Sequence, residues 1–147
     1  KENIALVEID HGPYLVKPVS ESFDSGERPV NIDVSNIVWL NHEQTTWVAP
    51  NSEAKISFLL ESKANDQLKS LFVKLPPGYK GAIATTGRVL HAVVIKGELN
   101  YMMPQNKVTK TLDSGSYFGS TDKAIHTITA EEEVTLYVRT NGTIKVK

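Results

Sequence analysis

The close spacing of short β-branched and aromatic segments is the feature of this 147-residue chain that most limits its fold. From Val34 onward such segments follow one another at short intervals, separated by glycine, proline and polar residues, and none has the apolar periodicity of a helix. This pattern is typical of an all-β sandwich or barrel. The predicted strands lie within residues 36–40, 45–50, 55–61, 70–76, 90–103, 110–118, 125–130, 134–140 and 143–147.

The last two segments, VTLYVRTNGTIKVK, predict a hairpin. Val134, Leu136 and Val138 alternate with other residues, as in a strand with one buried face. Asn141-Gly142 then supplies the two residues that tolerate the positive φ of a type I′ turn. We therefore expect residues 134–140 and 143–147 to pair with each other.

The first 33 residues differ from the rest. Residues 4–9 and 13–19 carry short strand signals, the second interrupted by prolines, and residues 22–33 indicate an irregular linker. We expect an N-terminal β arm at 1–33 and a single barrel domain at 34–147, with a loop at 62–70. Because an arm with strand signals can cover a sheet edge of another protomer, we also expect a homodimer.

Charge and composition exclude several partners. Sixteen basic residues nearly cancel seventeen acidic ones, so no strong field exists to attract nucleic acid or an anionic membrane. No apolar run approaches the roughly 20 residues of a membrane-spanning helix, and the chain opens without a signal-peptide pattern. We expect a soluble protein with no nucleic-acid or membrane partner. The absence of cysteine excludes disulfides and thiolate sites but is compatible with both cytoplasm and periplasm.

Two blocks of the sequence share one form. LPPGYKGAIATTGRVLHAVVIKGELNYMMP (75–104) and LDSGSYFGSTDKAIH (112–126) both place turn glycines near a strand, and each carries a histidine at or beside a strand start. Together they resemble the two motifs of the cupin superfamily, over about residues 36–140. WVAP, VKLPPGY and HAVVIKGEL resemble bacterial cupins of the DUF4437 type, related to the metal-binding cupin domain of ChrR-like anti-sigma factors. The resemblance implies a cupin-type antiparallel β-barrel, or jelly roll.

The cupin motifs also imply a metal site, but this chain lacks most of its ligands. With Gly97 as the closing glycine of the first motif, the His-x-His positions fall at about Ala84 and Thr86. Alanine offers no donor atom, and a neutral threonine hydroxyl is a poor ligand for metals that imidazole and carboxylate hold well. The glutamate position falls on Leu90, with His91 one residue later.

The second motif places its histidine on His126, eleven residues after Gly115. His91 and His126 are therefore weak candidate ligands, since two imidazoles hold Zn, Ni, Mn or Fe only loosely. We expect no resident metal or other cofactor, with a weakly bound divalent metal as the alternative. Each histidine alone also fits an inward core side chain with satisfied hydrogen bonds, because His91 shares a strand face with Val93 and Ile95.

The same region predicts a ligand pocket at the barrel mouth. Its candidate lining residues are Thr86, His91, Tyr101 and His126, with the two histidines on neighbouring strands on either side of a polar small molecule. Protonation below about pH 6.5 would favour an anionic ligand.

Three functions are compatible with the sequence. We expect a non-enzymatic small-molecule binding or sensing module with a decayed metal site, whose ligand is carbonyl-like or sugar-like. The alternatives are a metal-dependent cupin enzyme of the dioxygenase or isomerase type and a structural half of a two-cupin protein. The barrel itself hosts both enzymes and binding modules. The chain has no nucleophile elbow, phosphate-binding loop or HExxH motif, so no catalytic residue is assigned.

Overall fold

The computed structural model describes residues 16–21, 32–60 and 68–147. The chain divides into two compact units, Lys1–Ile32 and Asp33–Lys147. In the first unit the described residues form one 3-10 turn, η1 (Val19–Glu21), with Lys17 Nζ 3.2 Å from Glu21 Oε2. The strand predicted at 4–9 lies outside the described residues, as do residues 13–15 and 22–31; the described part of 13–19 contains no strand.

The second unit is built almost entirely from strands. It begins with a 3-10 turn, η2 (Val34–Asn36), whose first amides are capped by the Asp33 carboxylate, which accepts from Ser35 N at 2.9 Å. The strands are β1 (Lys55–Leu60), β2 (Lys69–Leu75), β3 (Tyr79–Thr85), β4 (Leu90–Lys96), β5 (Leu99–Met102), β6 (Thr109–Leu112), β7 (Tyr117–Ser120), β8 (Ile125–Ala130), β9 (Val134–Thr140) and β10 (Ile144–Val146).

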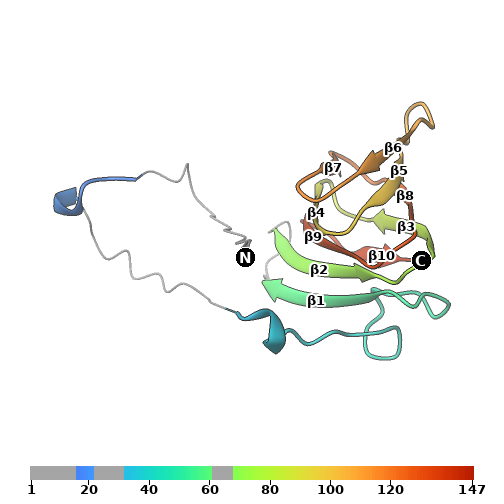
Figure 1. Cartoon of the computed structure of the whole chain (residues 1–147), viewed down its shortest axis with the longest axis horizontal. Coiled ribbons are helices and arrows are strands. Elements are labelled where there is room, and N and C mark those ends of the chain that lie inside the picture. Colours follow the sequence, from blue (N-terminus) through green and yellow to red (C-terminus); the bar gives the residue numbers. More distant parts are fainter. Residues whose placement is uncertain (1–15, 22–31, 61–67) are drawn as a thin grey trace. The chain divides into compact units, whose positions relative to one another are not determined.

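The strands form two five-stranded sheets that face each other in the second unit (Figure 1). The first sheet has the order β1-β2-β9-β4-β7 and the second the order β10-β3-β8-β5-β6, and all their strand pairs are antiparallel. Consecutive strands repeatedly change sheet, as in a jelly roll. The predicted all-β class is confirmed.

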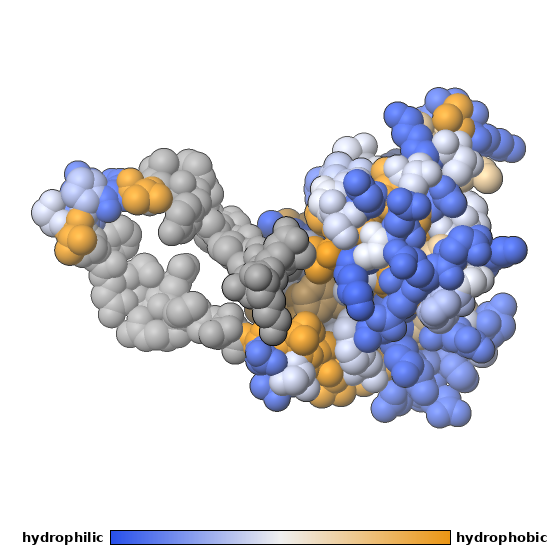
Figure 2. Space-filling view, in the orientation of Figure 1, coloured by the Kyte–Doolittle hydropathy of each residue, from blue (hydrophilic) through white to orange (hydrophobic). Residues whose placement is uncertain are grey.

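Alternating side chains from both sheets fill the core between them. Val134, Leu136 and Val138 of β9 are fully buried and meet inward residues of both neighbouring strands. In the second sheet Ile83 and Ile128 are likewise fully buried. The space-filling view shows mostly hydrophilic side chains on the visible face of this unit (Figure 2). Among the described residues, no helix has the length and hydropathy needed to cross a membrane.

The predicted hairpin at Asn141-Gly142 is wrong. β9 lies in the first sheet and β10 in the second, so the two strands do not pair, and neither turn residue has a positive φ. Asn141 Oδ1 instead accepts a hydrogen bond from Val89 N at 2.9 Å, and a Cβ on Gly142 would lie 2.3 Å from Gly87 N. Glycine is needed because two chain segments cross closely between the sheets, and this requirement mimics a turn signal in the sequence.

Three other expectations also differ from the structure. Residues 36–40 and 45–50 form no strand, and each contributes one isolated bridge, Leu40 to Ile56 and Val48 to Val146. β3 was not predicted, because Gly81 interrupts its apolar pattern and glycine weakens a strand signal. Of the loop predicted at 62–70, residues 62–67 lie outside the described part, while Lys69 already begins β2.

Candidate functional site

A buried histidine joins the two sheets inside the barrel. His126 of β8 pairs across the strands with Ile83 of β3, and its side chain is 0% exposed. Its Nδ1 lies 2.9 Å from the Tyr101 hydroxyl, and its Nε2 lies 3.1 Å from the Ser120 hydroxyl. A neutral imidazole has one donor and one acceptor nitrogen, and a hydroxyl can serve either. Both nitrogens are therefore satisfied by neutral groups.

Aromatic rings surround this histidine. The Tyr101 and Phe118 rings stack with centroids 4.6 Å apart, and the His126 ring lies 5.4 Å from Phe118 and 5.9 Å from Tyr101. Burial lowers the pKa of His126 and raises the pKa of Tyr101, because a low-dielectric surrounding disfavours each charged form. The cluster is consequently neutral at neutral pH.

Further hydroxyl groups lie at the same end of the barrel, around Leu90. This residue pairs with Ser120 on one side and with Thr140 on the other. The Thr140 hydroxyl donates to Val89 O at 2.8 Å, and the Thr85 hydroxyl accepts from Gly87 N at 3.1 Å. Thr85 and Thr140 are both buried. This end of the barrel therefore presents neutral hydrogen-bonding groups.

Neither predicted His-x-His position faces the interior of the barrel. The inward side chains of β3 are Ile83 and Thr85, whereas Ala84 lies between them on the other face. Thr86 follows the strand, is exposed, and donates its hydroxyl to Thr143 O at 3.1 Å. Leu90, at the glutamate position, does point inward and is fully buried.

His91 does not lie inside the barrel. Leu90, Ala92 and Val94 are the buried residues of β4, so His91 is on the outward face, where its Nδ1 contacts the Tyr117 hydroxyl and its ring lies 5.7 Å from the tyrosine ring. The inward face predicted for His91 is therefore wrong. His126 belongs to the other sheet, so the prediction that the two histidines lie on neighbouring strands is also wrong.

The donor set around His126 does not fit a cupin metal. The groups that reach its ring are hydroxyls, and its cross-strand neighbour Ile83 has no donor atom. Across residues 16–21, 32–60 and 68–147 no group of three or more His, Cys, Asp or Glu side chains could hold a metal ion.

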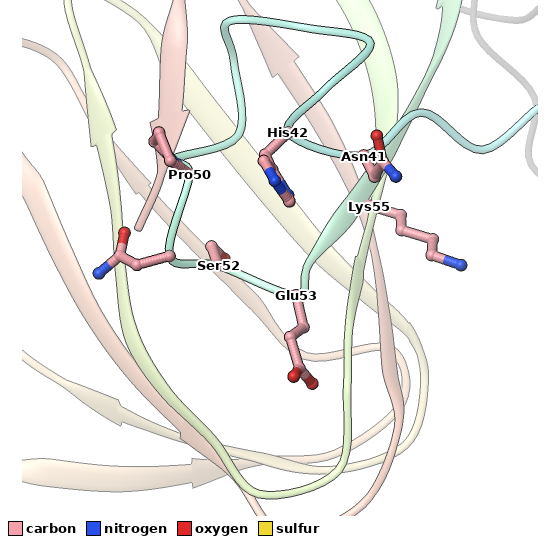
Figure 3. A pocket seen from close by; sticks show the side chains of 7 residues that line it. Asn41, His42, Pro50, Ser52, Glu53 and Lys55 are labelled. Carbon is pink, nitrogen blue, oxygen red and sulfur yellow. The ribbon is translucent and has the colours of Figure 1, made fainter.

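A surface pocket of about 420 Å³ lies elsewhere, lined by Asn41, His42, Lys55 and residues 50–53. His42 points into it between Pro50 and Asn41, while Glu53 and Lys55 carry their charged groups in different directions (Figure 3). The sequence assigned no site to this segment. Its polar groups do not converge on one point, unlike those around His126.

The fold of this chain is similar to that of solved cupin structures. It resembles an RmlC-like cupin from Ralstonia eutropha (TM-score 0.61, 13% identity, covering 82% of this chain and 73% of that one). It also resembles the cupin domain of Cnp3 from Schizosaccharomyces pombe (TM-score 0.58, 14% identity, covering 79% of this chain and 70% of that one). A third similar structure is an acetylacetone dioxygenase from Acinetobacter johnsonii (TM-score 0.55, 18% identity, covering 78% of this chain and 73% of that one). At these identities the likeness concerns the fold alone.

The family assignment is more specific than the likeness in fold. The model of the family described as "Domain of unknown function (DUF4437)" matches residues 1–147, and the chain belongs to this family. No curated protein matches the chain.

Proposed function

We propose that this protein is a metal-independent, non-catalytic cupin that binds or senses a small, neutral, polar molecule at the hydroxyl-lined end of its barrel. The observation that carries the proposal is the state of His126, which is fully buried with a hydroxyl on each ring nitrogen. In this proposal the chain has kept one histidine of a former metal site and has replaced its other ligands with Ile83, Thr85 and Leu90.

The chemistry of the site favours the ligand class. Ser120 is half-buried and bonds His126 Nε2, so it is the member of the network that a ligand entering from the barrel end meets first. The Ser120 hydroxyl has one donor proton and two acceptor lone pairs, so it can bond a ligand hydroxyl or carbonyl while it remains the partner of the imidazole. Burial lowers the pKa of His126, which disfavours the imidazolium that an anionic ligand would need. A carbonyl-like or sugar-like ligand fits better than an anion.

The metal-dependent enzyme is the weaker alternative. It needs three or four metal ligands around one centre, and the described residues contain no group of three or more His, Cys, Asp or Glu side chains that could hold a metal ion. A loosely held divalent metal on one or two imidazoles would supply no stable catalytic centre.

Titration calorimetry with a panel of neutral monosaccharides and short carbonyl compounds tests the proposal. At least one class should bind, and Ser120→Ala should weaken binding by about tenfold, the loss expected for one hydrogen bond to a buried group. His91→Gln, on the outer face, is the matched control and should leave binding unchanged. Binding that survives Ser120→Ala but is lost in His42→Ala would move the site to the surface pocket and refute the proposal.

A further inference from the structure

The two sheets have four edge strands, and the described chain covers two of them. Leu40 forms an antiparallel bridge to Ile56 on the free side of β1, with hydrogen bonds of 2.8 and 2.9 Å. Val48 forms a parallel bridge to Val146 on the free side of β10. No described residue pairs with the outer edge of β6 or β7.

The two remaining edges differ in their protection. β6 carries Lys110 within the strand, and an edge lysine opposes pairing with another chain. β7 consists of Tyr117, Phe118, Gly119 and Ser120, so it has no charge and no proline. Tyr117 is 56% exposed. Among the four edge strands of the described sheets, β7 is therefore the one that has no bridging segment and no charged residue.

The register of β7 determines which of its backbone groups face outward. Val94 N donates to Ser116 O, and β4 and β7 continue in register from there to Leu90 and Ser120. Because hydrogen-bonded positions alternate along an antiparallel pair, Phe118 and Ser120 direct their backbone groups toward β4. The N–H and C=O groups of Tyr117 and Gly119 then point to the open edge.

We propose that β7 pairs with β7 of a second copy of this chain, antiparallel about a twofold axis at Phe118. In this register Tyr117 lies opposite Gly119 of the second copy, and Gly119 lies opposite its Tyr117. The outward groups then form two reciprocal pairs with two hydrogen bonds each. This self-complementarity is what an isologous interface requires.

The side chains suit the same arrangement. Tyr117 already lies across Gly119 of its own strand, since a Cβ on Gly119 would be 2.6 Å from the Tyr117 hydroxyl. The glycine of the second copy likewise leaves room for the ring that faces it. The uncharged strand brings no like charges together. The inference is independent of the proposed ligand site, because Tyr117 lies on the outer face of the first sheet.

Sedimentation velocity from about 10 to 500 µM tests the pairing, because an interface this small belongs to the weak class. The wild-type protein should shift from monomer to dimer within this range. Tyr117→Lys should raise the midpoint concentration by at least about tenfold, as expected for the central side chain of a small interface. Ile125→Lys is the matched control, since Ile125 is 59% exposed on the second sheet, and it should leave the midpoint unchanged.

A backbone measurement keeps the proposal testable if Tyr117→Lys fails to fold. Amide hydrogen exchange at Tyr117 and Gly119 of the wild-type protein should slow as its concentration rises, while exchange at Thr111 of β6 should not. A monomer at the highest concentration, or a dimer in which Ile125→Lys but not Tyr117→Lys weakens association, would overturn the proposal. So would a dimer whose Tyr117 and Gly119 amides exchange at an unchanged rate, as pairing through the N-terminal arm predicts.

Discussion

Replacing Tyr101 by phenylalanine removes one hydroxyl and little volume from the interior of the barrel. The hydroxyl lies 2.9 Å from His126 Nδ1, and His126 is 0% exposed, so water cannot replace it. Leaving a buried polar atom without a partner costs about 1–3 kcal/mol. Tyr117→Phe is a matched control, because it removes a hydroxyl from the Nδ1 of His91 on an exposed surface. Water can satisfy His91, so the control should cost less than about 0.5 kcal/mol.

Urea unfolding followed by the fluorescence of Trp39 and Trp47 measures both changes. Tyr101→Phe should lower the midpoint with an unchanged slope, and its melting temperature should fall by roughly 3–10 °C. The reasoning is refuted if the two variants lose the same stability, or if Tyr101→Phe lies within about 0.5 kcal/mol of the wild-type protein.

Three further predictions follow from buried groups. Burial lowers the pKa of His126 in the folded protein, so at a pH just below the unfolded histidine pKa of about 6.5 the unfolded chain binds more protons than the folded one. The free energy of unfolding should therefore fall as the pH drops below about 6.5, and it should fall less in His126→Gln. Urea titrations at several pH values would show both effects. Gly142→Ala should destabilise the protein by about 1–3 kcal/mol, since the added Cβ would lie 2.3 Å from Gly87 N. Thermal unfolding measures this loss, and an unchanged melting temperature would disprove the close approach of these two segments. Burial raises the pKa of Tyr79 to about 12 and also raises the pKa of Tyr101, so an ultraviolet pH titration should show tyrosines that ionise late, and Tyr79→Phe should remove the one near pH 12; complete ionisation of the wild-type tyrosines near pH 10 would contradict this.

The sequence predicted strands well where one face alone is apolar. In β9 Val134, Leu136 and Val138 alternate with less buried residues, and the inward face followed correctly. In β4 both faces carry apolar residues, so the sequence could not decide whether His91 or Leu90 points inward. Pairing with β7 and β9 makes that choice, and pairing is a tertiary property.

The candidate site was also predicted only in part, because its contacts depend on the tertiary structure. The second cupin motif placed its histidine on His126, and Tyr101 was named separately as a pocket residue; the structure places the Tyr101 hydroxyl 2.9 Å from His126 Nδ1. Ser120 was missed as a partner of His126, six positions later in the chain, because the contact depends on the two sheets facing each other. Asn141-Gly142 misled for a related reason: glycine is needed there by a neighbouring segment, which a local pattern does not reveal.

The metal content of the purified protein tests the central claim most directly. Elemental analysis for Zn, Mn, Fe and Ni after gentle purification, without chelators, should find far less than one metal per chain, and His126→Ala should not change the result. A single imidazole flanked by hydroxyls cannot retain a metal as a complete ligand set does. One tightly held metal per chain, lost on His126→Ala, would contradict a metal-independent cupin and favour the enzyme.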